Sequence, residues 1–383
     1  MKISKIKIIV GLIIALPVLM WVFWLLSPRK KLVIAIVDKT VPDKTGQEHI
    51  SLNWILNHHK YSKNNKEGYQ IERDYFGFFP KDDDKFRLRG LERFSPSQVR
   101  KLSDDVDLAY ITDTYGIYNQ EWFHQKEEQK NPGILYGGLS NQDLSFLKLM
   151  KAKNKLVITE FNTIGSPTSV EIRSQFESLF GMKWSGWTGR YFNSLDTLTN
   201  KELPPWMVKN YKAANQNKWT FKKSGIVFVS ENDQVVILED STHLNNPMPY
   251  IITTATGQQN LGLPEKIKYP FWFDIIIPNE QINKTVAKFN LNLKPSGLAT
   301  LKKFGIPPSF PAVLQQNIAH PKFYYFSGDF CDNPISLTTS YFKGIGLFKF
   351  LFYDTEDPME RKSFFWNFYK PLITSILDKE QKH

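Results

Sequence analysis

The sequence predicts an α/β protein with a largely parallel sheet and flanking helices, preceded by one transmembrane helix. Three observations support this prediction. A long apolar run opens the chain, a continuous β-branched run follows it, and strand-like and helix-like segments then alternate with short connections. Such alternation is typical of βαβ units, in which a helix connects two parallel strands.

The first element is a membrane anchor. Ile8–Leu26 is apolar throughout and would span about 28 Å as a helix, close to the roughly 30 Å hydrocarbon core of a bilayer. The run is longer than the apolar part of a cleaved signal peptide, the alternative interpretation, and no small-residue cleavage site follows it. Because the leader before it is short, we expect a cytoplasmic N-terminus, a single pass through the lipid bilayer and a body outside the cytoplasm.

The body then alternates between strands and helices. Leu32–Val37 is the continuous apolar run expected of a strand buried on both faces. Later strands are marked by short β-branched or aromatic runs, and helices by apolar residues on successive turns. The expected strands are 32–37, 69–76, 107–112, 155–161, 225–229, 234–238, 250–254, 271–277 and 322–326. The expected helices are 49–60, 141–150, 170–180, 296–304, 341–352 and 358–377.

We divide the chain into three parts. Residues 1–31 form the cytoplasmic leader and anchor, 32–182 form an α/β domain, and 183–383 hold a Trp-rich insertion and further α/β elements packed on the same body. An eight-stranded (β/α)8-like barrel is the alternative, since eight strands can be counted. The two strands over 225–238 favour the open sheet, because they are spaced as an antiparallel hairpin.

Composition excludes several classes of function. The net charge is +11, but basic residues are interspersed with acids, and no nucleic-acid-binding motif is present. We therefore expect no nucleic acid as partner, and attraction to an anionic membrane surface or wall polymer instead. Cys331 is the one cysteine, which excludes an internal disulfide and a Cys-rich metal site. We expect no cofactor and no metal.

Carboxylates recur where the predicted strands end, and ligands meet α/β sheets at that edge. These residues are Asp38, Asp74, Asp113, Glu160, Glu239 with Asp240, and Asp329. Acids also serve as turn residues and helix caps, which is the alternative for each of them. From the loops that look most like a site, we predict Asp113, Glu160 and Asp329 as catalytic residues.

The same loops carry amides and aromatic rings, a combination that suits carbohydrate. The predicted substrate-binding residues are Asp38, Tyr115, Asn162, Trp184, Trp187, Arg190, Tyr191, Asp332 and Asn333. Paired carboxylates cleave glycosides as acid and base or as acid and nucleophile. For each tryptophan, a place in the hydrophobic core is the alternative.

The order of elements over Leu32–Met182 resembles the class I glutamine amidotransferase-like fold, which is flavodoxin-like. The resemblance rests on the strand ending in Asp74-Tyr75-Phe76-Gly77 and on the strand and helix order that follows. In that family a nucleophilic cysteine occupies a sharp strand-to-helix turn. The equivalent turn here, Glu160-Phe161-Asn162-Thr163, has no cysteine. The resemblance therefore implies that amidotransferase activity is absent, as in non-catalytic members attached to carbohydrate-active or membrane-transport machinery.

Two functions follow from these observations. The first is a membrane-anchored extracytoplasmic protein that binds or processes cell-envelope polysaccharide, as a carbohydrate hydrolase if it is an enzyme. The second is a catalytically inert scaffold or accessory subunit of a membrane complex, with a membrane protein as its partner.

Overall fold

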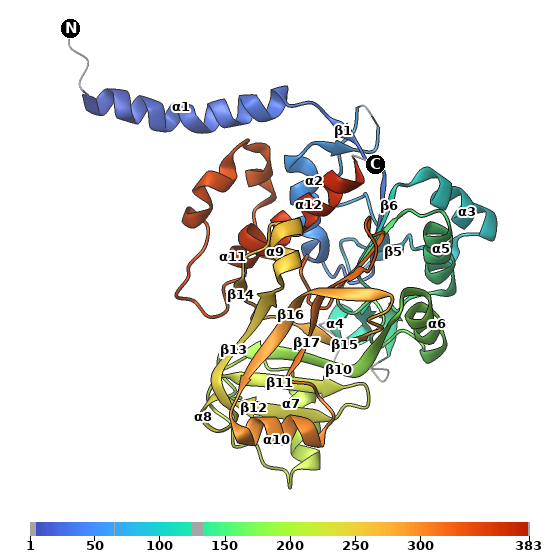
Figure 1. The fold of residues 1–383 in the computed structure, drawn as a ribbon, viewed down its shortest axis with the longest axis vertical. Coiled ribbons are helices and arrows are strands. Elements are labelled where there is room, and N and C mark those ends of the chain that lie inside the picture. The colour runs from blue at the N-terminus through green and yellow to red at the C-terminus, as the bar shows by residue number, and fades with distance from the viewer. Residues whose placement is uncertain (1–4, 65, 124–132, 382–383) are drawn as a thin grey trace.

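A computed structural model describes residues 5–64, 66–123 and 133–381, with the side chains of 5–13 outside the description. One large sheet runs through the body and carries helices on both faces at one end (Figure 1). A smaller sheet lies at the other end, and α1 (Lys5–Leu26) extends away from the body.

Five parallel strands form the centre of the large sheet. Their order is β4 (Phe76–Pro80), β2 (Ile34–Asp38), β6 (Leu108–Asp113), β9 (Leu156–Thr159) and β18 (Phe323–Phe326). From β2 the chain first builds β4 on one side and then returns to build β6 on the other. This reversal is the switch point at which open α/β sheets bind ligands, and it lies at the carboxyl ends of β2 and β6.

Alternate residues of these strands pack against opposite layers of helices, as the two-residue period of a strand requires. Ile36 and Tyr110 are paired in register and join the core with α2 (Ile50–His58) and α12 (Lys370–Glu380). The intervening residues join a second core on the other face. The helices of that second layer are α3 (Pro96–Asp105), α5 (Asn141–Ala152) and α6 (Val170–Phe180).

The prediction of a largely parallel sheet is wrong outside this centre. Of the nine neighbouring pairs in the ten-stranded sheet, four are parallel and five are antiparallel. The added strands are β17 (Ser309–Gln316), β16 (Asn283–Leu293), β13 (Leu244–Thr253) and β14 (Lys266–Lys268) beyond β18, and β5 (Phe86–Leu88) beyond β4. The described sheets are open, so the barrel alternative is also wrong.

A second, antiparallel sheet contains Trp184 and Trp187 of the Trp-rich region. Its order is β12 (Val235–Glu239), β11 (Gly225–Ser230), β10 (Met182–Phe192) and β15 (Phe273–Pro278). The hairpin predicted over 225–238 is confirmed by β11 and β12. The segment expected as an insertion instead begins with β10, a long strand that pairs with both β11 and β15.

Two predicted C-terminal helices differ from the structure. The segment 341–352 forms short 3-10 turns, Leu337–Tyr341 and Ile345–Leu351, because Gly344 between them has a left-handed φ of 83°. The helix expected from 358 begins at Lys362 and passes through a π-turn, Phe365–Tyr369. The remaining elements are β1 (Lys30–Lys31), β3 (Tyr61–Ser62), β7 (Ile117–Tyr118), β8 (Ile134–Tyr136), α4 (Asn119–Trp122), α7 (Pro205–Ala214), α8 (Asp240–His243), α9 (Ala255–Leu261), α10 (Pro295–Lys303), α11 (Lys362–Phe364) and the 3-10 turns Gln47–His49 and Leu91–Arg93.

The predicted membrane span, Ile8–Leu26, falls within α1, whose side chains are described only from Ile14 onward. In the described part of the chain, no helix has both the length and the apolar character needed to cross a bilayer.

Candidate functional site

Two predicted site residues, Asp38 and Asp113, end the strands on either side of the switch point and are paired in register. Asp38 is fully buried, and its Oδ2 lies 2.5 Å from Nδ1 of His49. Asp113 is 3% exposed and accepts hydrogen bonds from Thr40, from the Tyr115 amide and from the Asn162 side chain. Burial, with repulsion from Asp38, raises the pKa of Asp113 to about 7 against the lowering effect of these hydrogen bonds.

Glu160 follows β9 and is fully buried. One carboxylate oxygen accepts a hydrogen bond from the Tyr110 hydroxyl. The other accepts hydrogen bonds from the backbone amides of Phe330 at 3.0 Å and Cys331 at 2.9 Å. Burial raises the pKa of Glu160 to about 8, although these hydrogen bonds oppose the shift. This geometry holds the loop after β18 rather than presenting Glu160 to a substrate.

The loop after β18, residues 327–333, carries two more predicted acids and is fixed at several points. The Asp329 amide donates to the carbonyl of Trp272, and the Asn333 side chain donates to Ser51 Oγ at 3.0 Å. Gly328 is required by close packing, because a Cβ there would lie 2.3 Å from the ring of Phe330. The sequence-predicted Asn333 is therefore a buried structural residue of this loop.

Three carboxylates converge beside the switch point. One oxygen from each of Glu48, Asp329 and Asp332 lies within 4.8 Å of the others, and we call these residues the acid cluster. Burial, followed by repulsion from Asp329, Asp332, Asp113 and Asp38, raises the pKa of Glu48 well above its ordinary value. Burial and the nearby Asp332 raise the pKa of Asp329 in the same way.

Arginines and aromatic rings border the acid cluster. Arg361 lies 3.2 Å from Asp332 and stacks over the ring of Phe271 at 3.6 Å. Arg190, a predicted site residue, stacks over Phe271 and Trp272 at 4.9 and 5.6 Å and pairs with Glu202. Because Phe271 and Trp272 are only half-buried, they give this rim exposed aromatic surface.

Three predicted substrate-binding aromatics lie elsewhere. Trp184, Trp187 and Tyr191 are 5%, 8% and 3% exposed and pack into the hydrophobic cores through β10. Their burial fits the alternative of a place in the hydrophobic core. Tyr115 and Asn162 are half-buried near Asp113 and remain available to a ligand.

The strand-end acids divide into two groups. Asp38, Asp113, Glu160 and Asp329 approach one another closely enough that their charges interact. The predicted strand 69–76 is wrong, because β4 begins only at Phe76, so Asp74 precedes a strand and pairs with Lys63 at 2.7 Å. Glu239 accepts hydrogen bonds from two backbone amides just before β11. For this second group the turn and capping alternative is the one that fits the contacts.

Sequence reasoning missed Glu48, Trp272 and Arg361. Glu48 lies in the 3-10 turn Gln47–His49 directly before α2, well after β2 ends at Asp38, so no strand-end pattern marks it. Trp272 lies within the predicted strand 271–277, just before the observed strand β15. Arg361 lies 29 residues from Asp332 in the sequence and donates a hydrogen bond to its carbonyl. No local sequence pattern could have assigned Arg361 to this site.

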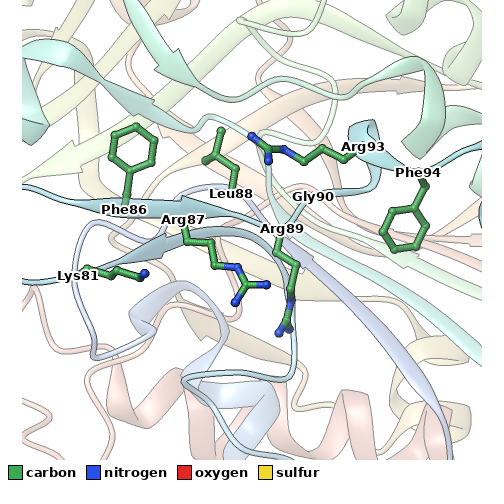
Figure 2. A pocket seen from close by; sticks show the side chains of 8 residues that line it. All are labelled: Lys81, Phe86, Arg87, Leu88, Arg89, Gly90, Arg93 and Phe94. Carbon is green, nitrogen blue, oxygen red and sulfur yellow. The ribbon is translucent and has the colours of Figure 1, made fainter.

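A separate hollow of about 570 Å³ lies along β5 and the turn after it (Figure 2). Its lining holds four basic side chains and no acidic one: Lys81, Arg87, Arg89 and Arg93, with Phe86, Leu88, Gly90 and Phe94. Arg89 donates hydrogen bonds to the carbonyls of Arg73 and Tyr75, whereas Arg87 and Arg93 are exposed. We call this surface the basic hollow.

The burial of Glu160 generates a pH prediction. The folded protein keeps the Glu160 proton up to about pH 8, whereas an ordinary glutamate loses it near pH 4.5. Stability from this group is therefore fully present below about pH 4.5 and is lost as the pH rises through 8. We expect Glu160→Gln to show a smaller fall in the free energy of unfolding between pH 5 and pH 8 than the wild type, measured by urea unfolding.

Asp113 and Asp274, whose pKa values burial raises to about 7, leave a residual fall in that variant. The matched control is Glu171→Gln on the exposed face of α6, which should keep the wild-type pH dependence. An identical slope for Glu160→Gln and wild type would contradict the prediction.

Comparison with known proteins identifies no family for this chain. No protein-family model matches it, and no curated protein matches it. Among solved structures, it is similar to a ThuA-like protein of Bacteroides uniformis, with 8% identity and a TM-score of 0.37 over 82% of this chain and 89% of that chain. ThuA-like proteins have a glutamine amidotransferase-like fold. This neighbour is distant, and the chain remains an α/β protein without an assigned family.

Proposed function

We propose that the protein is anchored in the membrane and uses the carboxyl edge of its parallel strands to bind or process a cell-envelope polysaccharide outside the cytoplasm. The observation that carries the proposal is the convergence of Asp113, Asp329 and Asp332 at the switch point. Open α/β sheets bind ligands at this position, and carboxylates accept hydrogen bonds from sugar hydroxyl groups.

The chemistry of this edge suits proton transfer. Asp113 has a pKa of about 7, so it can either hold or accept a proton near neutral pH. Asp329 is 8% exposed and makes no hydrogen bond or ion pair through its carboxylate with the residues the structure describes. We assign Asp113 and Asp329 to the reacting edge, and Glu160 to positioning the loop that carries Asp329.

The half-buried residues at the rim would carry most of the contact with a polymer. Trp272 and Tyr115 present aromatic surface, and the Asn162 side chain presents an amide beside Asp113. Trp272 takes the stacking role first predicted for Trp184 and Trp187, since its ring is half-buried under Arg190 and its carbonyl accepts a hydrogen bond from the Asp329 amide.

Exposed apolar residues support the anchoring part of the proposal. They occur on α1 and on the nearby turn Ile345–Leu351, and α1 meets the chain just before that turn through a hydrogen bond from the Lys343 amide to the Met20 carbonyl. The most exposed of them are Ile14, Val18, Phe23, Leu26, Leu347, Phe350 and Leu351. An exposed apolar surface of this extent favours burial against a partner or a membrane, and a bilayer that holds α1 would bury it.

A catalytically inert scaffold for a membrane complex is the second candidate. It is favoured by Glu160, whose carboxylate is fully occupied inside the protein, and by the turn after β9. That turn places Asn162 at a left-handed φ of 61°, and a carboxamide is not a nucleophile. The scaffold proposal predicts binding to a membrane protein and no turnover.

The reacting edge is tested by replacing one carboxylate. We expect Asp329→Asn to lower polysaccharide turnover on the order of 10²-fold, the scale of losing a general acid or base. The assay follows the release of reducing ends from purified cell-wall polysaccharide by the full-length protein in detergent. Asp105→Asn, an exposed substitution at the end of α3, is the matched control. Wild-type turnover in both variants would contradict a catalytic role, and no turnover by the wild type would favour the scaffold.

The basic hollow predicts that the polymer is anionic. Reversing one exposed charge with Arg87→Glu should weaken binding of an anionic wall polymer several-fold, because the long-range attraction falls. Cosedimentation with the purified polymer at low and high salt measures this, and the difference between the proteins should shrink at high salt. Lys288→Glu makes the same charge change on β16 and should bind more tightly than Arg87→Glu. Equal binding by the two variants would exclude the hollow as a contact surface.

A further inference from the structure

We infer that the acid cluster of Glu48, Asp329 and Asp332 is a binding site for a divalent cation of the calcium class. The sequence alone led us to expect no metal. The inference concerns ion binding and can be tested without any polysaccharide. It changes one part of the proposed function: if Asp329 holds a cation, proton transfer at the reacting edge falls to Asp113.

The geometry of the three carboxylates fits a single ion. One oxygen from each lies within 4.8 Å of the others. Oxygens on opposite sides of a Ca²⁺ ion, each roughly 2.3–2.6 Å from it, are about 4.6–5.2 Å apart, so all three can reach one ion without moving far. An all-oxygen set of hard ligands favours Ca²⁺, Mg²⁺ or Mn²⁺ over softer metals.

Two of the three ligands have no partner that would explain their position. Oε2 of Glu48 is buried without a hydrogen bond among the described residues. Asp329 is 8% exposed, and no described residue donates a hydrogen bond to its carboxylate or forms an ion pair with it. A buried carboxylate without a partner is strongly unfavourable. Because both are aimed at the same point, a bound cation would satisfy both at once.

The third ligand, Asp332, is already oriented. Gln47 donates to one of its oxygens, and Arg361 lies 3.2 Å from the other. Ligands of metal ions are commonly fixed in this way by neighbouring hydrogen bonds.

The surrounding charges still favour a cation. Arg361 offsets one of the three cluster charges, and Arg190 lies beyond it at the rim. Asp113 and Asp38 add negative charge on the sheet side, although His49 pairs with Asp38. The limited exposure of Asp329 and Asp332, at 8% and 6%, suits a small ion better than a bulky ligand.

Terbium luminescence tests this inference on the full-length protein in detergent. Tb³⁺ replaces Ca²⁺ at oxygen sites and emits when a nearby tryptophan is excited, and the Trp272 carbonyl binds the Asp329 amide. We expect saturable emission that added Ca²⁺ abolishes. Asp329→Asn and Glu48→Gln should each weaken binding by roughly tenfold or more, because each removes one ligand. Asp105→Asn should leave binding unchanged.

Thermal unfolding with and without Ca²⁺ separates a ligand role from a folding defect. Without Ca²⁺, Asp329→Asn should be at least as stable as the wild type, because it removes a repelled buried charge. With Ca²⁺, only the wild type and Asp105→Asn should gain stability. Tb³⁺ affinity unchanged in both ligand variants, or no Ca²⁺-dependent gain in the wild type, would overturn the inference. Ion binding without polysaccharide binding would leave it intact and count against the proposed function alone.

Discussion

The fully buried carboxylate of Glu160 connects the parts of the protein that form the candidate site. It accepts hydrogen bonds from Tyr110 on β6 and from two amides of the loop after β18. The Tyr110 hydroxyl also forms a hydrogen bond of 2.8 Å with the hydroxyl of Tyr369, which directly precedes α12. Leaving a buried amide without a partner costs about 1–3 kcal/mol, so the position of this loop depends on Glu160. The strands, the loop and the C-terminal helix are thereby held in one arrangement.

That arrangement brings carboxylates together at some electrostatic cost. Asp329 and Asp332 come from the loop that Glu160 holds, Asp113 comes from the end of β6, and Glu48 comes from the turn before α2. Arg361 offsets only part of the negative charge, and a ring nitrogen of His49 hydrogen-bonds Asp38. Buried groups with raised pKa values that share one edge of a sheet are typical of functional sites, because folding alone would favour their removal. The same repulsion makes the edge receptive to protons, to cations and to hydroxyl donors.

The sequence predicts the centre of the fold better than its periphery. The parallel strands β2, β6 and β9 were predicted as short apolar runs ending in acids, whereas β4 was predicted at 69–76 and begins only at Phe76. Three of the acids that approach one another at the switch point, Asp38, Asp113 and Asp329, come from the search for acids at strand ends. Of the antiparallel extension, only the end of β13 was predicted, as the strand 250–254. β16 was missed, although Phe289–Leu293 alternates apolar and polar residues. Trp184 and Trp187 pack into the cores, and a tryptophan that fills a core and one that contacts a ligand look alike in sequence. Arg361 and Glu48 reach the site through tertiary packing, which no local pattern reports.

A crystal structure of the full-length protein with a fragment of purified envelope polysaccharide tests the central claim most directly. If the carboxyl edge of the parallel strands is the functional site, the sugar will lie on the rim beside Trp272, within hydrogen-bonding distance of Asp329 or Asp113. Sugar bound only at another surface, with the edge unchanged, would contradict the claim.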